Sequence, residues 1–190
     1  MRQGPVSDTP NTFLSLTELS FSGTRVRDFD IIHIHRLPKL SVLFLNNTGI
    51  GNEAVYLLIP LKHTLTQLTL ATNPDIDNTS IDMNGLRTLA KRVDEEEWIV
   101  DIEVPWGCED YIDNIPKAYL LYPSSPLITD PEACSALSCA ALRRNLSAHA
   151  ERNPAIVVGG TKDEMVLRLE GLLRTRKLDL LVRRMIGIED

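Results

Sequence analysis

Apolar residues recur along the first half of the chain in a pattern that predicts short buried strands. Residues 16–26, 40–50 and 65–76 each have apolar side chains at the first, fourth and sixth positions, followed by Thr or Asn at the ninth. The fourth and sixth residues of each segment would point to the same side of a strand. We therefore expect one strand in each segment and a fourth strand in a weaker copy at residues 99–105.

Amphipathic stretches lie between these segments and predict helices that return the chain to the next strand. Residues 28–37 and 52–61 are two such stretches, and residues 79–90 predict a longer last helix that runs toward Glu95–Glu97. The Thr or Asn after each strand can hydrogen-bond to the backbone where the chain turns out of the strand. A single strand–helix unit cannot bury its own apolar face, so stacking of the units would supply the core.

This repeat resembles the leucine-rich repeat family over residues 13–105. Thr24 and Thr48, together with the short helices, make it similar to the ribonuclease-inhibitor-like and F-box-associated sub-types. The resemblance implies an α/β fold class, with a short right-handed solenoid of about four strands. A coincidence of leucines in an ordinary α/β domain is the alternative.

The strand residues that alternate with the leucines would line the concave face of such a solenoid. We expect this face to bind another protein, and the alternative is that it is merely solvated or covered by a neighbouring segment. The expected residues are Glu18, Ser20, Ser22, Val42, Phe44, Asn46, Gln67, Thr69, Ala71, Asp101 and Glu103.

Residues 106–136 differ in composition and are expected to form a proline-rich capping segment or linker. Five prolines from Pro105 to Pro131 would interrupt any regular element. However, Ala118–Tyr122 is too apolar for a free linker, so we expect this strip to cap the open end of the repeats. A flexible tether is the alternative. Residues 1–12 are expected to form an N-terminal tail.

Residues 137–190 predict a small all-α module of the helix–loop–helix type. Ser138 can cap a first helix, and Thr161 and Glu164 have the spacing of a capping box at the start of a second helix. A further helix is expected over residues 175–185. The buried stripe of the second helix is expected at Met165, Leu169 and Leu172.

The two predicted helices resemble a SAP domain, a small module that binds DNA. The matching parts are Leu142-Arg143-Arg144-Asn145-Leu146, Gly160-Thr161-Lys162 and Arg168-Leu169. The resemblance implies DNA contacts from Arg143, Arg144, Gly160, Thr161, Lys162 and Arg168, with a phosphate at the helix N-terminus. The loop between the helices is longer than the family pattern, and Asp163 and Glu164 would oppose a phosphate. An ordinary helix start with a solvated basic face is the alternative.

Charge is distributed unequally between these parts. The chain of 190 residues has a formal net charge of −6, made up of −9 in residues 1–136 and +3 in residues 137–190. This asymmetry suggests two units with different partners, and only the basic unit suits nucleic acid.

Motifs for catalysis, nucleotide binding or zinc are not found in the sequence, so we expect a non-enzymatic protein without cofactor, metal or small-molecule substrate. His33 and His35 have no third ligand nearby, and Cys134 and Cys139 are expected to be buried free thiols. The sparse cysteines and the lack of a signal sequence or membrane span favour an intracellular location, and the SAP resemblance implies the nucleus rather than the cytoplasm.

These observations lead to one functional expectation. The chain would be an adaptor that binds another protein through the concave face and double-stranded DNA, weakly, through the SAP-like helices. The alternatives are a substrate-recognition subunit of an F-box-type ubiquitin ligase, or a purely protein-binding scaffold with a helical cap.

Overall fold

The predicted strands form one parallel sheet in the computed structural model, which describes residues 13–71 and 81–188. Within these residues the strands are β1 (Glu18–Ser20), β2 (Val42–Phe44), β3 (Gln67–Thr69) and β4 (Asp101–Glu103), and they follow one another across the sheet in sequence order. The register aligns the central residues of the strands, Leu19, Leu43, Leu68 and Ile102. The fold is therefore mixed α/β, and each parallel connection has to return the chain across the sheet.

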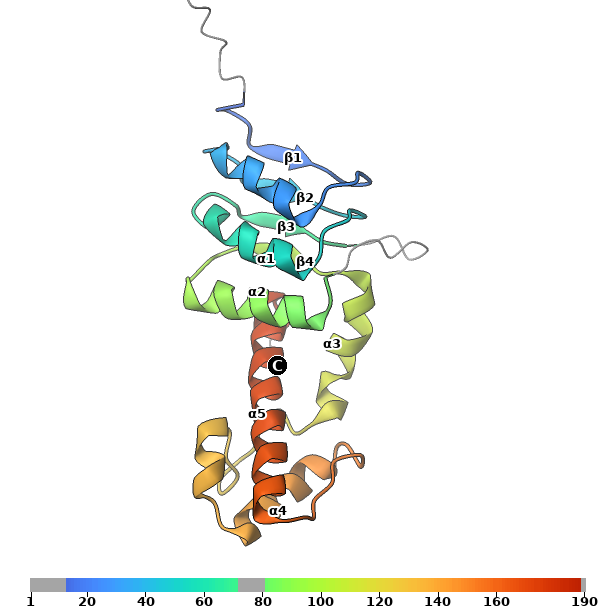
Figure 1. Cartoon of the computed structure of the whole chain (residues 1–190), viewed down its shortest axis with the longest axis vertical. Coiled ribbons are helices and arrows are strands. Elements are labelled where there is room, and N and C mark those ends of the chain that lie inside the picture. Colours follow the sequence, from blue (N-terminus) through green and yellow to red (C-terminus); the bar gives the residue numbers. More distant parts are fainter. Residues whose placement is uncertain (1–12, 72–80, 189–190) are drawn as a thin grey trace, which may run out of the picture.

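Helical segments make these connections and cover one side of the strands (Figure 1). They are the 3-10 helix η1 (Asp28–Arg36), the helix α1 (Asn52–Leu58) with the 3-10 turn η2 (Ile59–Leu61), and the helix α2 (Met83–Glu95). The helices expected in residues 28–37, 52–61 and 79–90 are thus confirmed, although residues 79 and 80 lie outside the described part. Thr24 and Thr48 donate to the carbonyl oxygens of Phe21 and Leu45, as their spacing predicted.

The core lies between the sheet and these helices. The second and third copies of the repeat bury their motif leucines completely or nearly so, whereas Leu19 and Phe21 in the first copy are only half-buried. Among the described residues β1 has a neighbouring strand on one side only, whereas the other edge strand, β4, is followed by helix α3 (Trp106–Ala118) and shares its core with helix α5 (Lys162–Met185). The buried motif leucines are Leu40, Leu43, Leu45, Leu65, Leu68 and Leu70.

The proline-rich segment contains a helix, so the expectation that its prolines exclude regular structure is wrong. Helix α3 (Trp106–Ala118) begins directly after Pro105 and holds Pro116 in its last turn. Pro105 is the N-cap residue, where a missing N–H removes no helical hydrogen bond, whereas Pro116 removes the one bond that its N–H would have made to the carbonyl oxygen of Ile112, close to the point where α3 ends. The side chains of Cys108, Ile112 and Ile115 in α3 are buried in the same core as the repeats.

The expected separate helix over residues 175–185 is also absent from the described residues, because one helix, α5 (Lys162–Met185), runs through this region. Its 24 residues correspond to a length of about 36 Å. Helix α5 contains no proline, and Gly171 is its single glycine, which costs only about 1 kcal/mol. In the described part of the chain, no helix is both long and apolar enough to cross a membrane.

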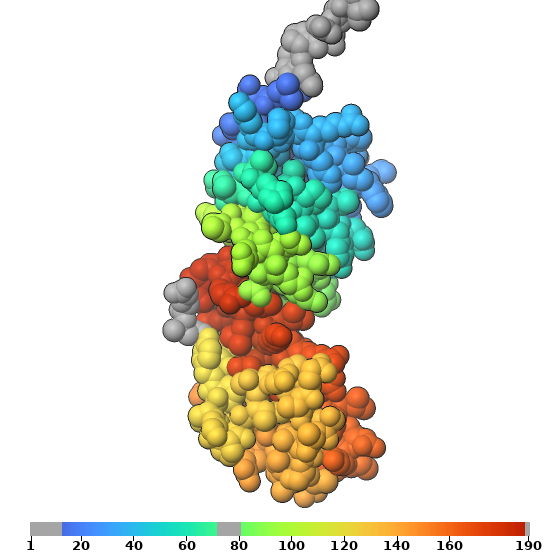
Figure 2. Space-filling model, turned by 90° about the vertical axis from the view of Figure 1, so that its left-hand side faces the viewer, coloured from blue at the N-terminus to red at the C-terminus, as the bar shows by residue number. Residues whose placement is uncertain are grey.

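Helix α5 joins two hydrophobic clusters. Its first half packs on α4 (Cys139–Ala150) and on the 3-10 helix η3 (Pro131–Ala136), and its second half packs on α2. Figure 1 shows α5 along the long axis of the molecule, and Figure 2 shows its C-terminal half between α2 and the segments below. A domain boundary near residue 137 stays a prediction, since α5 contributes to both clusters.

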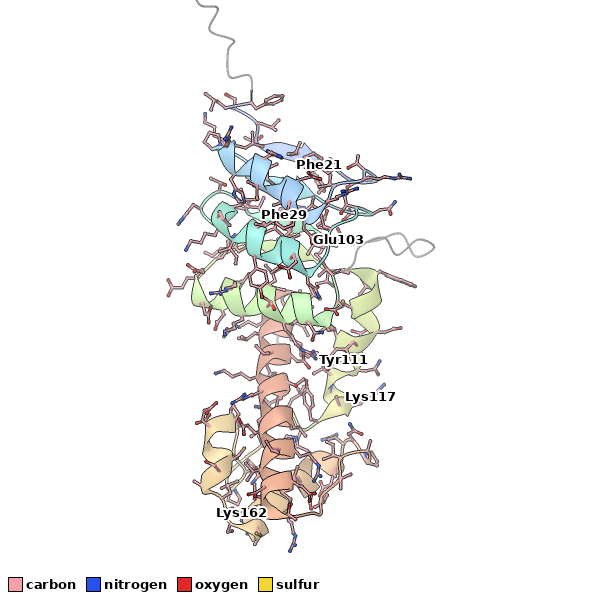
Figure 3. All side chains as sticks on the ribbon, in the orientation of Figure 1. Phe21, Phe29, Glu103, Tyr111, Lys117 and Lys162 are labelled. Carbon is pink, nitrogen blue, oxygen red and sulfur yellow. The ribbon has the colours of Figure 1, made fainter. Side chains whose placement is uncertain are left out.

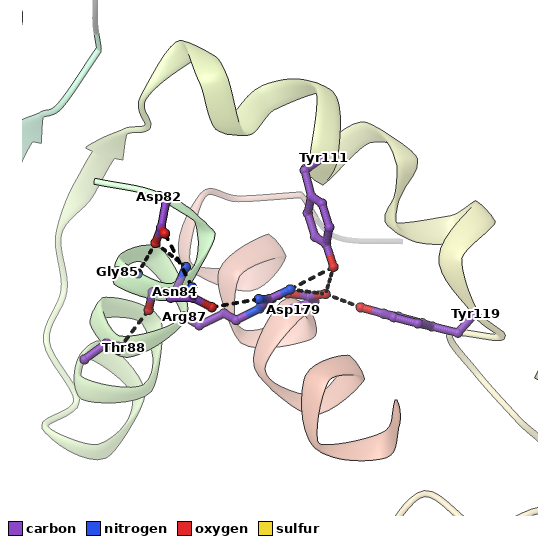
Figure 4. Close-up of polar contacts among 8 residues, drawn as sticks. All are labelled: Asp82, Asn84, Gly85, Arg87, Thr88, Tyr111, Tyr119 and Asp179. Atoms are coloured by element: carbon purple, nitrogen blue, oxygen red, sulfur yellow. Dashed lines mark hydrogen bonds and ion pairs between the residues drawn. The ribbon is translucent and has the colours of Figure 1, made fainter. Parts of the chain in front are cut away.

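A buried carboxylate fixes α5 against α2 and α3 (Figure 4). Asp179 of α5 is fully buried and accepts from Arg87 Nε at 2.7 Å and from Arg87 Nη2 at 3.3 Å. Tyr111 Oη donates to Asp179 Oδ2 at 3.0 Å, and Tyr119 Oη donates to the same oxygen. Burial, with the Asp179 carboxylate beside it, raises the pKa of Tyr119 far above its usual range, so this hydroxyl keeps its proton.

A second set of contacts holds the segment after α3. Arg176 Nε of α5 donates to the carbonyl oxygen of Leu121 at 2.8 Å, and the backbone N–H of Leu120 donates to His149 Nδ1 at 3.1 Å. Asn153 Nδ2 donates to the carbonyl oxygen of Ala118 at 3.2 Å. These bonds tie the end of α3 to α4, to α5 and to the loop between them.

Replacing Asp179 by Asn should destabilise the protein by about 3 kcal/mol, because it leaves the largely buried Arg87 guanidinium without its counter-charge. Urea unfolding of the full chain measures this loss. Glu132→Gln is the matched control, since it breaks the exposed ion pair with Arg174 and should cost less than about 1 kcal/mol. Equal losses in the two variants would contradict the structural role of Asp179.

Stability should also fall in mild acid because of His149. Burial, with Arg176 nearby, lowers the pKa of His149 to about 4, below the usual 6.5. The unfolded chain therefore binds a proton between these values while the folded chain does not, so stability is complete above about pH 6.5 and declines toward pH 4. His149→Asn retains an acceptor for the N–H of Leu120 and should flatten this part of the stability–pH curve. An unchanged slope in the variant would assign the pH dependence to other groups.

Candidate functional site

The side of the sheet opposite the helices carries the residues that the sequence assigned to a binding surface. We call it the polar sheet face and define it by nine of these residues, leaving out Ser22 and Ala71, which follow β1 and β3. The nine are Glu18, Ser20, Val42, Phe44, Asn46, Gln67, Thr69, Asp101 and Glu103. The strand register arranges eight of these residues in two rows that run across the sheet. One row is Glu18, Val42, Gln67 and Asp101, and the other is Ser20, Phe44, Thr69 and Glu103.

Solvent reaches this face at both edges. Glu18 and Ser20 on β1 are exposed, and so are Asp101 and Glu103 on β4. Gln67 is exposed as well, while the more apolar middle of the face, Val42 and Phe44, and the neighbouring Asn46 are half-buried. The exposed edges and half-buried middle leave a shallow surface that an extended chain can contact.

A pocket of about 320 Å³ lies on this face between β3 and β4. Its polar lining consists of Gln67, Thr69, Asp101 and Glu103. The Thr69 side chain is only 4% exposed, and its Oγ1 has no hydrogen-bond partner among the described residues. Asn46 Oδ1 is likewise buried without a partner. Burying a hydroxyl that makes no hydrogen bond costs about 1–3 kcal/mol, so the sheet is not optimised for stability here.

The charge of the polar sheet face has one sign. Glu18, Asp101 and Glu103 are its ionisable residues, and none of its members is a lysine or arginine. Asp101 and Glu103 are two apart on one strand and project to the same side. A cationic partner would relieve the repulsion between these like charges.

The helices at the other end of the molecule form the small core expected from the sequence. Ser138 caps α4, and the capping box of Thr161 and Glu164 at the start of α5 is present in full. The expected buried stripe is corrected at one position: Leu173 is fully buried, whereas Leu172 is half-buried. The residues that pack between the two helices are Leu142, Leu146, Met165, Leu169 and Leu173.

The six residues expected to contact DNA differ in their exposure and in their hydrogen bonds. Arg143, Arg144 and Lys162 are exposed, and Gly160 adopts φ +131°, a conformation that favours glycine. Arg168 Nη1 donates to the carbonyl oxygens of Val157 and Gly159 at 2.9 and 3.0 Å, so this guanidinium holds its own loop.

The helix N-terminus itself already has an anionic partner. The backbone N–H of Thr161 donates to Glu164 Oε2 at 2.8 Å and lowers the pKa of that carboxyl. A phosphate would have to share this position with the Glu164 carboxylate. Lys162 lies at the lower end of the molecule in Figure 3, far from Glu103 in the upper half.

The remaining candidates from the sequence form no site. His35 Nε2 lies 2.6 Å from the carbonyl oxygen of Leu57, and in residues 13–71 and 81–188 no group of three His, Cys, Asp or Glu residues could hold a metal ion. Cys134 is buried, and burial, with the nearby carboxylate of Glu170, raises the pKa of its thiol to about 11. Cys139 is exposed, so the expectation that both thiols are buried is wrong for Cys139.

Sequence reasoning missed a groove of about 540 Å³ between α2 and the end of α5. Val93, Val100, Leu181 and Met185 are among its lining residues, and Ile99 beside them is 89% exposed. The groove exists because the second half of α5 lies on the repeats. The sequence offered no local signal for that placement.

Comparison with known proteins adds no relative: the chain matches no protein-family model, and neither curated proteins nor solved structures gave a match.

Proposed function

We propose that this protein is a non-enzymatic adaptor built on a short leucine-rich-repeat solenoid, with the polar sheet face as the binding surface for another protein. Parallel strands in sequence order and the alignment of the motif residues Leu43, Leu68 and Ile102 support the repeat assignment. Each repeat then contributes one strand to a continuous surface.

The observation that carries the proposal is the polar, open character of the sheet on the side away from the leucines. Parallel sheets are usually covered on both faces, and their strands are then apolar on both sides. Here β1 and β4 alternate exposed polar residues, three of them acidic, with more buried apolar ones. A face of this kind suits contact with a partner better than packing inside one domain.

A second function follows from the basic end of the molecule. Exposed Arg143 and Arg144 on α4 and Lys162 at the start of α5 belong to two helices that share one small core, which is the arrangement implied by the SAP resemblance. We propose that this end makes weak contacts with double-stranded DNA, and that the protein acts in the nucleus. With about three or four phosphate contacts, binding should be in the micromolar to 100 micromolar range.

Photocrosslinking in cells tests the protein-binding face. The photoreactive residue p-benzoylphenylalanine should give a discrete crosslinked protein when it replaces Gln67 on the polar sheet face. It should give none when it replaces Glu53, an exposed residue of α1 on the opposite side. Crosslinks of equal yield from both positions, or from neither, would show that the face is not a binding surface.

Fluorescence anisotropy of a labelled short duplex with the full chain tests the DNA contact. The logarithm of the affinity should fall with the logarithm of salt at a slope of about −3 to −4. Lys162→Glu should weaken binding about threefold to tenfold, because it reverses one charge next to the phosphate backbone. Lys117→Glu on α3 makes the same charge change away from this end and should have a smaller effect (Figure 3). No binding at low salt would refute the DNA function.

A further inference from the structure

The two rows of the polar sheet face set a distance between its acidic edges. Three strand spacings of about 4.8 Å separate β1 from β4, so Glu18 and the pair Asp101 and Glu103 stand about 14 Å apart across the sheet. An extended chain advances about 3.4 Å per residue, and residues four apart lie on the same side. Such residues are also separated by about 14 Å, which matches the distance between the acidic edges.

The pocket at the β4 edge has the chemistry of a cation site. Asp101 and Glu103 line it with carboxylate side chains, and Thr69, whose buried Oγ1 has no partner among the described residues, lines the same pocket. A guanidinium group has five N–H donors and can bond to carboxylates and a hydroxyl together. The hydroxyl of Thr69 is an uncharged group, so it is an observation independent of the acidic charge, and no described residue supplies it with a hydrogen bond.

The middle of the face is apolar enough for an uncharged side chain. Val42 and Phe44 lie between the two acidic edges and are half-buried. A residue midway between two basic residues of an extended chain would stand about 7 Å from each of them, over the space between β2, with Val42 and Phe44, and β3.

From these distances we infer that the polar sheet face binds an extended basic segment of a partner protein, with two arginines four residues apart and an apolar residue midway. One arginine enters the pocket lined by Asp101, Glu103 and Thr69, and the other pairs with Glu18. This inference rests on the proposed protein-binding function of the face and specifies the partner's chemistry.

Titration of the isotope-labelled full chain with synthetic peptides, followed by NMR, tests the spacing. The first probe is a nine-residue peptide with two arginines four positions apart, a valine midway, and serine and glycine elsewhere. The second has the same composition with the arginines two positions apart. The first should bind about threefold more tightly at low salt and shift the amides of Thr69 and Glu103. Equal affinities would show unspecific attraction and overturn the inference.

Variants of the acidic edges locate the two contacts. Glu103→Gln should weaken both peptides about twofold to fivefold, whereas Glu18→Gln should weaken only the peptide with the wider spacing. Glu53→Gln removes the same charge from the opposite side of the molecule and should leave both affinities unchanged. If Glu18→Gln has the same effect on the two peptides, the two-point contact is refuted.

Thr69→Val separates a binding role from a structural one. Valine has nearly the shape of threonine and removes the unpartnered hydroxyl, so the free protein should melt a few degrees higher. The same variant should bind the first peptide about threefold to tenfold more weakly, because the hydrogen bond to the guanidinium is lost. A stabilised variant with unchanged peptide affinity would remove Thr69 from the site.

Failure of this inference and failure of the proposed function give different results. One outcome is that the photoreactive residue at position 67 crosslinks a protein while neither peptide binds at concentrations up to about 2 mM. The face then binds a partner that is not an extended basic segment, and the inference is wrong. If position 67 gives no crosslink and neither peptide binds, both proposals fall.

Discussion

The position of α5 depends on the hydrogen bonds and the ion pair that the buried carboxylate of Asp179 makes. A fully buried charge is tolerable only when its partners are in place, and Arg87, Tyr111 and Tyr119 come from α2 and from the region of α3. Asp179 has hydrogen-bond partners only when α5 lies against these three donors. In this position the second half of α5 packs on α2, and the first half holds α4 through their shared core. The leucine core supplies the driving force, whereas Asp179 determines where the final helix must lie.

The polar sheet face, by contrast, contains groups that lack, among the described residues, the partners that would stabilise them. Thr69 keeps a hydroxyl in a buried position where valine would fit, and three carboxylates share one face without a basic neighbour among the face residues. Both features reduce the stability of the free protein. A protein selected for stability alone would not retain them, which is why the polar face rather than the helical side is the candidate binding surface.

Local patterns in the sequence were sufficient for the strands of the repeats and for the starts of α4 and α5. Alternation around Leu43 and Leu68 predicted the strands, and the spacing of Thr161 and Glu164 predicted the capping box, because each depends on residues within a few positions. The course of α5 could not be predicted in this way. Asp179 meets Arg87, which is 92 residues away, and nothing near either residue indicates the other. The burial of Thr69 likewise arises from strands that are distant in sequence, so the acidic residues of the candidate site were predictable and its unpartnered hydroxyl was not.

The continuity of α5 has a consequence for bivalent binding. A flexible linker would let the sheet and the basic end search for their partners independently, with an effective concentration set by the length of the linker. A single helix of about 36 Å instead holds the two surfaces in one geometry. If the protein and the DNA proposed as partners bind at the same time, their joint binding carries little entropic cost when their spacing fits this geometry and is prevented when it does not. The molecule would therefore select assemblies by their dimensions as well as by their chemistry.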